Sequence, residues 1–323
     1  MSKLKTSFEL AKRSFSVLME NKRLLLFPFL TTVCTLGILL FVLMPVAFQP
    51  TGHSYNEMEH WEKVGSSIVS IEKTNSEKVD DKTGKTTTET KVDGSINQWV
   101  YIALVPLYFL SIFLAAFFNV AFYNEIIKAL NGDSVSIMGG LKFAKSKLKM
   151  ILKWTLFFGT IGCIIKFLET RLDIVGQYVL RMINFTFNVA CLFVIPVMVR
   201  SKEDEKPWVH LKKSAQIIKD KWGETVVGFA GITGVGMIIT FTLGFLWMLI
   251  FSISFLTEVP DNIIIIQLVA GFPLFIIFSA CLSYVMGILN KIYLAALYVY
   301  ATEGVIPNKF DEESMAGSWE VKE

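Results

Sequence analysis

Charged residues, histidines and catalytic motifs are all scarce in this sequence. Only 18% of the 323 residues are charged, against about a quarter in soluble domains, and the mean hydropathy is +0.52. The three histidines all lie outside the long apolar runs, and no G-x-S-x-G, H-E-x-x-H or Walker loop occurs. These absences exclude a soluble enzyme and a disordered chain. They predict a protein without enzymatic activity, cofactor or metal ion.

Cysteine is rare as well. The four cysteines lie inside apolar segments, and no pair has the spacing of a metal or redox motif. A disulfide-rich secreted domain is therefore excluded, and we interpret the thiols as small buried apolar groups. Lys and Arg number 31 against 28 Asp and Glu, so the net charge gives no indication of a nucleic-acid partner.

The sequence contains several long apolar runs with few or no charged residues. Runs of about 18 or more apolar residues are typical of transmembrane helices. The weakest of them reaches Lys166 after about three helical turns. The predicted spans are Leu24–Phe48, Trp99–Asn124, Trp154–Leu168, Ile174–Val199, Thr225–Thr257 and Ile263–Asn290.

The distribution of basic residues decides whether the weak segment crosses the membrane. Basic clusters precede the first span, follow the second and follow the fourth. Because cytoplasmic loops carry the excess of Lys and Arg, all three clusters belong on the cytoplasmic side. That requires Trp154–Leu168 to cross. The sequence thus predicts an all-α polytopic protein of the cell (inner) membrane, with six spans and both termini in the cytoplasm.

Each basic cluster also carries an apolar stripe at helical spacing. The stripes cover residues 4–18, 137–151 and 208–222. A basic amphipathic helix beside a span is typical of a membrane interface, with its lysines toward anionic headgroups. A helix packed on cytoplasmic loops is the alternative. The predicted headgroup contacts are Lys142, Lys145, Lys149, Lys212 and Lys213.

The returning spans predict an internal threefold repeat. Phe118-Asn119-Val120-Ala121 recurs as Phe187-Asn188-Val189-Ala190, and Leu289-Asn290 stands at the third equivalent place. Each repeat would be a basic interfacial helix followed by a transmembrane hairpin. Parallel repeats of this kind are related by an axis along the membrane normal. We therefore expect the three asparagines to approach one another at mid-membrane.

The first repeat carries a polar insertion, residues 49–98, expected outside the cell. β-branched alternation around residues 81–84 predicts a small β-hairpin, and a short helix is expected over Ser54–Val64. His53, Glu57 and His60 would share one face of that helix, which we interpret as solvated. The whole of 1–323 is predicted to be one membrane domain, with a disordered cytoplasmic tail over 303–323.

The layout resembles a bacterial and archaeal family of uncharacterised six-span membrane proteins. The residues that carry the resemblance are Phe118-Asn119-Val120-Ala121, Asn131-Gly132-Asp133-Ser134, Gly139-Gly140-Leu141, Phe193-Val194-Ile195-Pro196-Val197, and Lys213-Ser214 with Lys221-Trp222-Gly223-Glu224. More distantly, the pattern of helix plus hairpin is similar to the membrane domain of some glycerophosphodiester phosphodiesterases. No catalytic domain of that kind is present, so the resemblance implies a fold and no activity.

Polar residues within the spans are the candidate ligand site. Arg181, Asn184 and Asn188 form one stripe at spacings of three and four. Lys166 and Glu169 face together, and Asn119 and Asn290 complete the set. Intramembrane polar groups are often functional, but asparagines also hydrogen bond between helices and long basic side chains extend to the interface. Both interpretations stay open.

Three classes of function are compatible with these features. A non-enzymatic membrane scaffold or lipid-organising protein, with anionic lipid as its partner, accounts for the basic helices and the missing catalytic motifs. A transporter or channel for a small solute or lipid accounts for the repeat and the polar stripe. A lipid-modifying intramembrane enzyme accounts only for the distant resemblance. We rank them in that order.

The six-span topology predicts where single cysteines are accessible. In a background without the native four, a membrane-impermeant thiol reagent added to intact cells should label a cysteine placed at Ser76. A cysteine placed at Lys147 should be labelled only after the cells are opened. Labelling of both positions from outside would contradict the topology.

Overall fold

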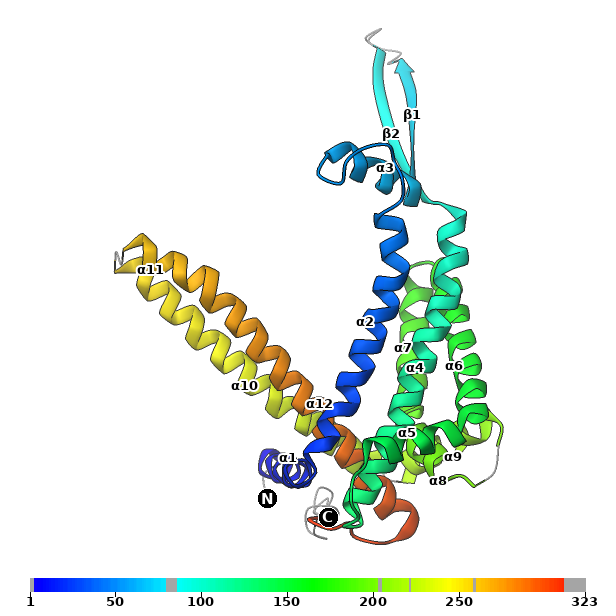
Figure 1. Cartoon of the computed structure of the whole chain (residues 1–323), viewed down its shortest axis with the longest axis vertical. Coiled ribbons are helices and arrows are strands. Elements are labelled where there is room, and N and C mark those ends of the chain that lie inside the picture. Colours follow the sequence, from blue (N-terminus) through cyan, green and yellow to red (C-terminus); the bar gives the residue numbers. More distant parts are fainter. Residues whose placement is uncertain (1–2, 80–85, 203–204, 221, 258–259, 311–323) are drawn as a thin grey trace. The chain divides into compact units, whose positions relative to one another are not determined.

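The structure is a computed structural model and is almost entirely helical in the part that it describes (Figure 1). The described residues are 3–79, 86–202, 205–220, 222–257 and 260–310. The chain divides into two compact units. Unit 1 comprises residues 1–30 with 115–323, and unit 2 comprises residues 31–114.

The elements follow one another in a simple order. They are α1 (Lys3–Glu20), η1 (Lys22–Leu25), α2 (Leu26–Ala47), α3 (Met58–Ile68), β1 (Val69–Val79), β2 (Thr86–Ile96), α4 (Gln98–Leu130), α5 (Ile137–Ser146), α6 (Leu148–Glu169), α7 (Ile174–Ala190), α8 (Val194–Arg200), α9 (Pro207–Asp220), α10 (Trp222–Leu256), α11 (Asp261–Ile266), the π-helix η2 (Gln267–Gly271) and α12 (Phe272–Glu303).

Among the described residues, six helical segments are long and apolar enough to cross a membrane. They are Lys22–Ala47, Ile102–Leu130, Leu148–Glu169, Ile174–Arg200, Phe229–Leu256 and Ile263–Glu303. The prediction of a helical, multi-pass membrane protein is confirmed. The orientation of the termini and the repeat stay predictions.

The third span is longer than the sequence pattern indicated, because the second amphipathic stripe is not one helix. Residues 137–151 were expected to form a single interfacial helix. Instead α5 ends at Ser146, Lys147 caps it with its N–H on Ala144 O, and α6 begins at Leu148. The span therefore begins at Leu148 instead of Trp154 and ends at Glu169, and its 22 residues are enough to cross.

The fourth span is interrupted between α7 and α8, and a side chain from α9 satisfies the break. Ser214 Oγ donates to Ala190 O over 2.6 Å and accepts from Phe193 N over 3.0 Å. Irregular backbone at membrane depth is tolerated where other protein groups replace the lost hydrogen bonds. Ser214 is fully buried, so this contact fixes α9 against the interruption.

The core of unit 1 lies where α1, α10 and the C-terminal part of α12 pack together. In Figure 1, α10 and α12 run side by side. From Ile288 to Val299, α12 is buried at every position except Lys291, which is half-buried. Close approach of α1 to α10 depends on a glycine, because a Cβ at Gly231 would clash with the side chain of Ser7.

A buried carboxylate joins the end of α4 to the start of α5. Glu125 is fully buried and accepts from Lys128 Nζ (2.8 Å), Asn124 Nδ2 (2.8 Å) and the backbone N–H of Ser136 (2.7 Å). Ser136 in turn caps α5. With one cation and two further donors, the charge is compensated, as a buried carboxylate requires.

Unit 2 contains the predicted insertion. β1 and β2 pair antiparallel from Val69↔Ile96 to Val79↔Thr86, and the predicted turn residues 81–84 lie outside the described residues. The helix expected over Ser54–Val64 is α3, which begins only at Met58 because Glu57 has the extended conformation of an N-cap.

Residues 304–310 of the predicted tail pack on unit 1. Gly304 ends α12 in the left-handed conformation, with φ +66°. Beyond it, Asn308 N donates to Leu130 O over 3.1 Å, and Lys309 Nζ lies 2.8 Å from Glu20 Oε1. The rest of the tail lies outside the described residues.

The contact between α5 and α4 gives a prediction for thermal stability. A Cβ at Gly140 would lie 2.9 Å from Ala121 O, Glu125 Cγ and Phe27 Cζ. Since one of these atoms belongs to the backbone, Gly140→Ala should destabilise unit 1 by roughly 1–3 kcal/mol through overpacking. The measurement is the thermal midpoint of the purified chain in detergent.

Gly287→Ala is the matched control, since a Cβ there meets no atom of the described residues within 4 Å. It should leave the midpoint unchanged or raise it, because Ala favours helix over Gly. Equal midpoints for the two variants would contradict the packing argument.

Candidate functional site

The three repeated asparagines have three different partners. Asn119 Oδ1 accepts from Lys291 Nζ over 2.7 Å, and its amide donates to Ala115 O over 2.8 Å. Asn290 Nδ2 donates to Thr233 Oγ1 over 3.0 Å. Asn188 Nδ2 bonds only within α7 among the hydrogen bonds of the described residues, to Asn184 O (2.8 Å) and Asn184 Oδ1 (2.9 Å). The structure therefore shows no shared hydrogen bond among the three amides.

The expected polar stripe also divides into separate pairs. Glu169 Oε2 accepts from Lys166 Nζ over 2.9 Å, and Arg181 Nε lies 3.9 Å from Glu169 Oε1. These three residues form one small ion-pair group, while Asn184 and Asn188 form a second. Lys166 and Arg181 are 77% and 68% exposed, so this group lies at the surface of unit 1 and not in its core.

Lys291 is the intramembrane residue that the sequence reasoning missed. The charge-free run of the sixth span ends at Asn290, so Lys291 is absent from the predicted site, although α12 continues to Glu303, the expected cytoplasmic end of this helix. Lys291 therefore lies about 18 Å along the helix from that end, at 1.5 Å per residue, which is close to mid-membrane. Its Nζ also lies 5.5 Å from the centre of the Phe122 ring, over which a cation is stabilised. The unbroken helical pattern after Lys291 was the available indication.

Asn290 and Lys291 together link three helices. Asn290 is only 8% exposed and connects α12 to α10 through Thr233, while Lys291 connects α12 to α4 through Asn119. Within the described residues, Asn290 Oδ1 has no hydrogen-bond partner. A polar pair in this position both holds the helices in register and offers groups that a solute could bind.

The second candidate is a basic cleft in unit 1. Four lysines surround a cavity of about 430 Å³ at the junction of α5 and α6. Its lining is Lys145, Ser146, Lys147, Leu148, Lys149, Met150 and Lys202. Lys147 Nζ donates to Ser201 O, which holds the segment after α8 beside this junction. Of the predicted headgroup lysines, Lys145 and Lys149 line the cleft.

The remaining predicted headgroup lysines have other surroundings. Lys142 and Lys212 are exposed outside this cleft. Lys213 Nζ pairs with Glu205 Oε1 over 2.7 Å, and this hydrogen bond holds the pKa of Glu205 below its usual value. Because Lys213 is already paired, it is a weaker candidate for an anionic ligand. Lys202, which we had not proposed, takes its place.

Fold and sites together define a multi-pass α-helical membrane protein with polar contacts inside the bundle and a basic cleft at a helix junction. Residues 99–307, more than half of the chain, match the model of a family of unknown function, DUF6159, and the chain belongs to that family. The predicted membership in an uncharacterised membrane family is confirmed. No curated protein and no solved structure was found to be similar to the chain.

The contrast between two asparagines gives a prediction that separates structure from ligand binding. Asn119→Leu removes the acceptor of a half-buried ammonium, whereas Asn188→Leu removes only two exposed bonds within one helix. Losing a hydrogen bond to a charged group costs about 1.5–3 kcal/mol. We expect a clearly lower thermal midpoint for Asn119→Leu and a nearly unchanged one for Asn188→Leu.

Both midpoints are measured in the same detergent by thermal unfolding of the full chain. If Asn119→Leu left the midpoint unchanged, the Lys291–Asn119 contact would not be structural, and a ligand-binding role for this pair would be favoured.

Proposed function

We propose that this protein is a non-enzymatic membrane protein that binds and organises anionic lipid, and that the lysine cleft at the α5–α6 junction is its headgroup site. The proposal rests mainly on one observation, which is that four lysines line the same cavity. The described residues that line it contribute four ammonium groups and no carboxylate. A phosphate group neutralises such a cluster, and each basic residue near an anionic surface contributes about 1 kcal/mol.

The surface next to the cleft supports a lipid over a free phosphate. Leu148, Leu152 and Leu156 follow one another at spacings of four along α6, and they are 37%, 51% and 52% exposed. They form one apolar stripe that starts in the cleft wall and runs along the span. A headgroup in the cleft would place its acyl chain on this stripe, whereas inorganic phosphate would leave the stripe uncovered.

The sequence pattern supports the location of the site. All three basic clusters, including the cleft, belong on the cytoplasmic side by the excess of Lys and Arg. This assignment puts both termini in the cytoplasm, the β1–β2 pair outside, and the protein in the cell membrane. The threefold repeat of helix plus hairpin belongs to the same proposal, with α1, α5 and α9 as its interfacial helices.

A transporter for a small solute is the second candidate, and the Lys291–Asn119 contact is what favours it. A half-buried lysine near mid-membrane is costly and is often part of a substrate or ion pathway. The stability of Asn119→Leu described above discriminates between the two candidates. An enzymatic role has no support from a catalytic motif in the sequence.

The lipid proposal predicts the effect of neutralising the cleft. Lys145→Gln, Lys149→Gln and Lys202→Gln together should lower the affinity for phosphatidylglycerol about 100-fold, from three charges at about 1 kcal/mol each. Lys147 is kept, because its bond to Ser201 O is structural. Binding is measured by native mass spectrometry of the full chain titrated with lipid.

The control is a second triple variant of equal charge, Lys12→Gln, Lys22→Gln and Lys219→Gln, whose lysines are exposed and do not line the cleft. It should change the affinity only a few-fold. Equal losses in the two triple variants would show a diffuse surface attraction and reject the cleft. Full competition by soluble glycerophosphate would identify a free phosphate ligand instead of a lipid.

A further inference from the structure

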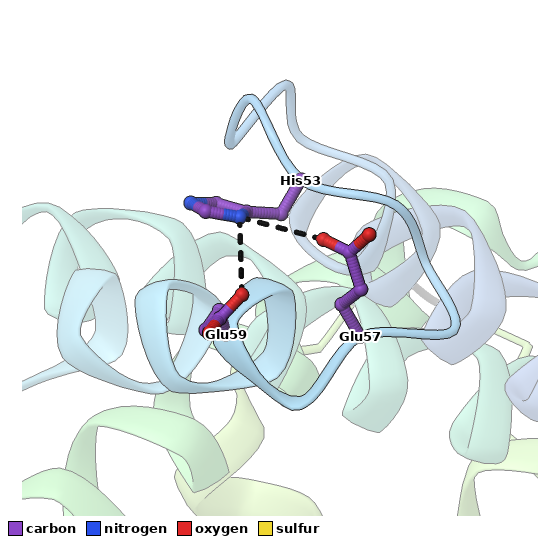
Figure 2. A group of neighbouring side chains, drawn as sticks. All are labelled: His53, Glu57 and Glu59. Carbon is purple, nitrogen blue, oxygen red and sulfur yellow. Dashed lines mark ion pairs between the residues drawn. The ribbon is translucent and has the colours of Figure 1, made fainter.

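Three side chains with metal-ligating atoms converge in unit 2, and none of them lines the cleft or takes part in the intramembrane contacts. Figure 2 shows His53 above Glu57 and Glu59, with one ring nitrogen directed toward both carboxylates. His53 Nδ1 lies 3.4 Å from Glu57 Oε2 and 3.4 Å from Glu59 Oε2. All three ligating atoms lie within 4.8 Å of one another.

The structure changes the composition of the cluster that the sequence suggested. His60 was expected beside His53 and Glu57, but its ring is fully buried. Its Nε2 lies 2.9 Å from Ala47 O and its Nδ1 lies 2.6 Å from Thr51 Oγ1. Glu59 takes its place, because α3 starts at Met58 and its first turn points this carboxylate toward His53.

The loop that carries His53 is held in place by its own contacts. Gly52 has φ +81°, a left-handed conformation that sharply turns the chain just before His53. The bonds of His60 anchor the loop at Ala47 and Thr51, and Lys63 Nζ donates to Thr51 O over 3.1 Å. A set of ligands on a loop fixed in this way binds with a smaller ordering cost.

From this geometry we infer that His53, Glu57 and Glu59 form a binding site for a divalent transition metal, with Zn²⁺ as the expected ion. Ligand bonds of about 2.0–2.2 Å at tetrahedral angles place neighbouring ligand atoms about 3.3–3.6 Å apart. The two measured separations from His53 Nδ1 fall in that range. The three ligating atoms lie within 4.8 Å of one another, and Glu59 is 68% exposed, so its side chain has room to rotate toward Glu57.

An ordinary hydrogen-bonded pair fits these distances less well. An N–H···O bond is usually 2.9–3.0 Å long, and a single ring N–H directed at two oxygens 3.4 Å away satisfies neither. A metal between the three atoms uses the Nδ1 lone pair, with the proton on Nε2. Three protein ligands leave the fourth tetrahedral position to water, as in open zinc sites.

The ligand types favour a transition metal over Ca²⁺ or Mg²⁺. Those hard cations take oxygen ligands, and Ca²⁺ takes six to eight of them. An imidazole nitrogen with two carboxylates suits Zn²⁺ and its neighbours. A bound ion would tie the loop residue His53 to the N-cap and first turn of α3.

The test is Zn²⁺ binding to the full-length protein in detergent, purified without a polyhistidine tag and followed by isothermal titration calorimetry. We expect saturable binding of one Zn²⁺ per chain that is not displaced by excess Mg²⁺. His53→Ala, Glu57→Gln and Glu59→Gln should each weaken it at least tenfold, since loss of even a supporting group costs that much at metal sites. Glu62→Gln, an exposed carboxylate on the same helix, should leave the affinity unchanged.

A triple variant of His53, Glu57 and Glu59 decides the assignment. If the wild-type chain binds no Zn²⁺, or if the triple variant binds it as tightly as the wild type, the site is rejected. Circular dichroism and the thermal midpoint of each variant without metal show whether it folds like the wild type. The lipid-binding experiment is independent, because the cleft lies in unit 1.

Discussion

Polar groups carried into the apolar part of this protein must be satisfied by the protein itself, because hydrocarbon supplies no hydrogen bonds. The interruption between α7 and α8 shows how this is done for the backbone. Ser214 serves both sides of the break, as donor to Ala190 O and as acceptor from Phe193 N. The helix α9, which is not one of the six spans, is thereby held at a defined place against a span.

The same constraint applies to charged side chains. Glu125 is fully buried yet accepts three hydrogen bonds, one of them from Lys128. Lys291 has its acceptor in Asn119 and a ring face in Phe122. The Lys291–Asn119 bond joins α12 to α4, and the Glu125–Ser136 bond joins α4 to the start of α5, so these contacts both satisfy a polar group and hold two elements together. Glycines at 140 and 231 allow the close approach that such short bonds require.

Charge that is not buried in this way is concentrated at helix junctions. The junction of α5 and α6 presents four lysines around one cavity, while Lys213 and Glu205 neutralise each other nearby. A region of uncompensated positive charge beside an exposed apolar stripe matches the two halves of an anionic lipid. In unit 2 the acidic groups outnumber the basic one, because two carboxylates face one imidazole.

The class of protein and its family could both be predicted from the amino-acid sequence. Six apolar runs and three basic clusters predict a multi-pass helical protein, because span length and hydropathy are local properties of the chain. Lys291 is absent from the predicted site because the charge-free run ends at Asn290, although the helix continues to Glu303 as expected. The start of α6 was missed because the apolar stripe continues through Lys147 without marking the break.

Which polar residues meet could not be predicted, because it depends on how the helices pack. Matching depth made Asn119, Asn188 and Asn290 look equivalent, yet depth says nothing about which way each helix is turned. Helix packing gives Asn119 the partner Lys291 and Asn290 the partner Thr233, whereas Asn188 bonds to Asn184 on its own helix. Lys202, which lines the cleft, comes from a segment far from α5 and α6 in the sequence. In the His53 cluster, the start of α3 at Met58 places Glu59 beside His53, where His60 was expected. Such pairings depend on contacts between segments, which a pattern along one chain does not contain.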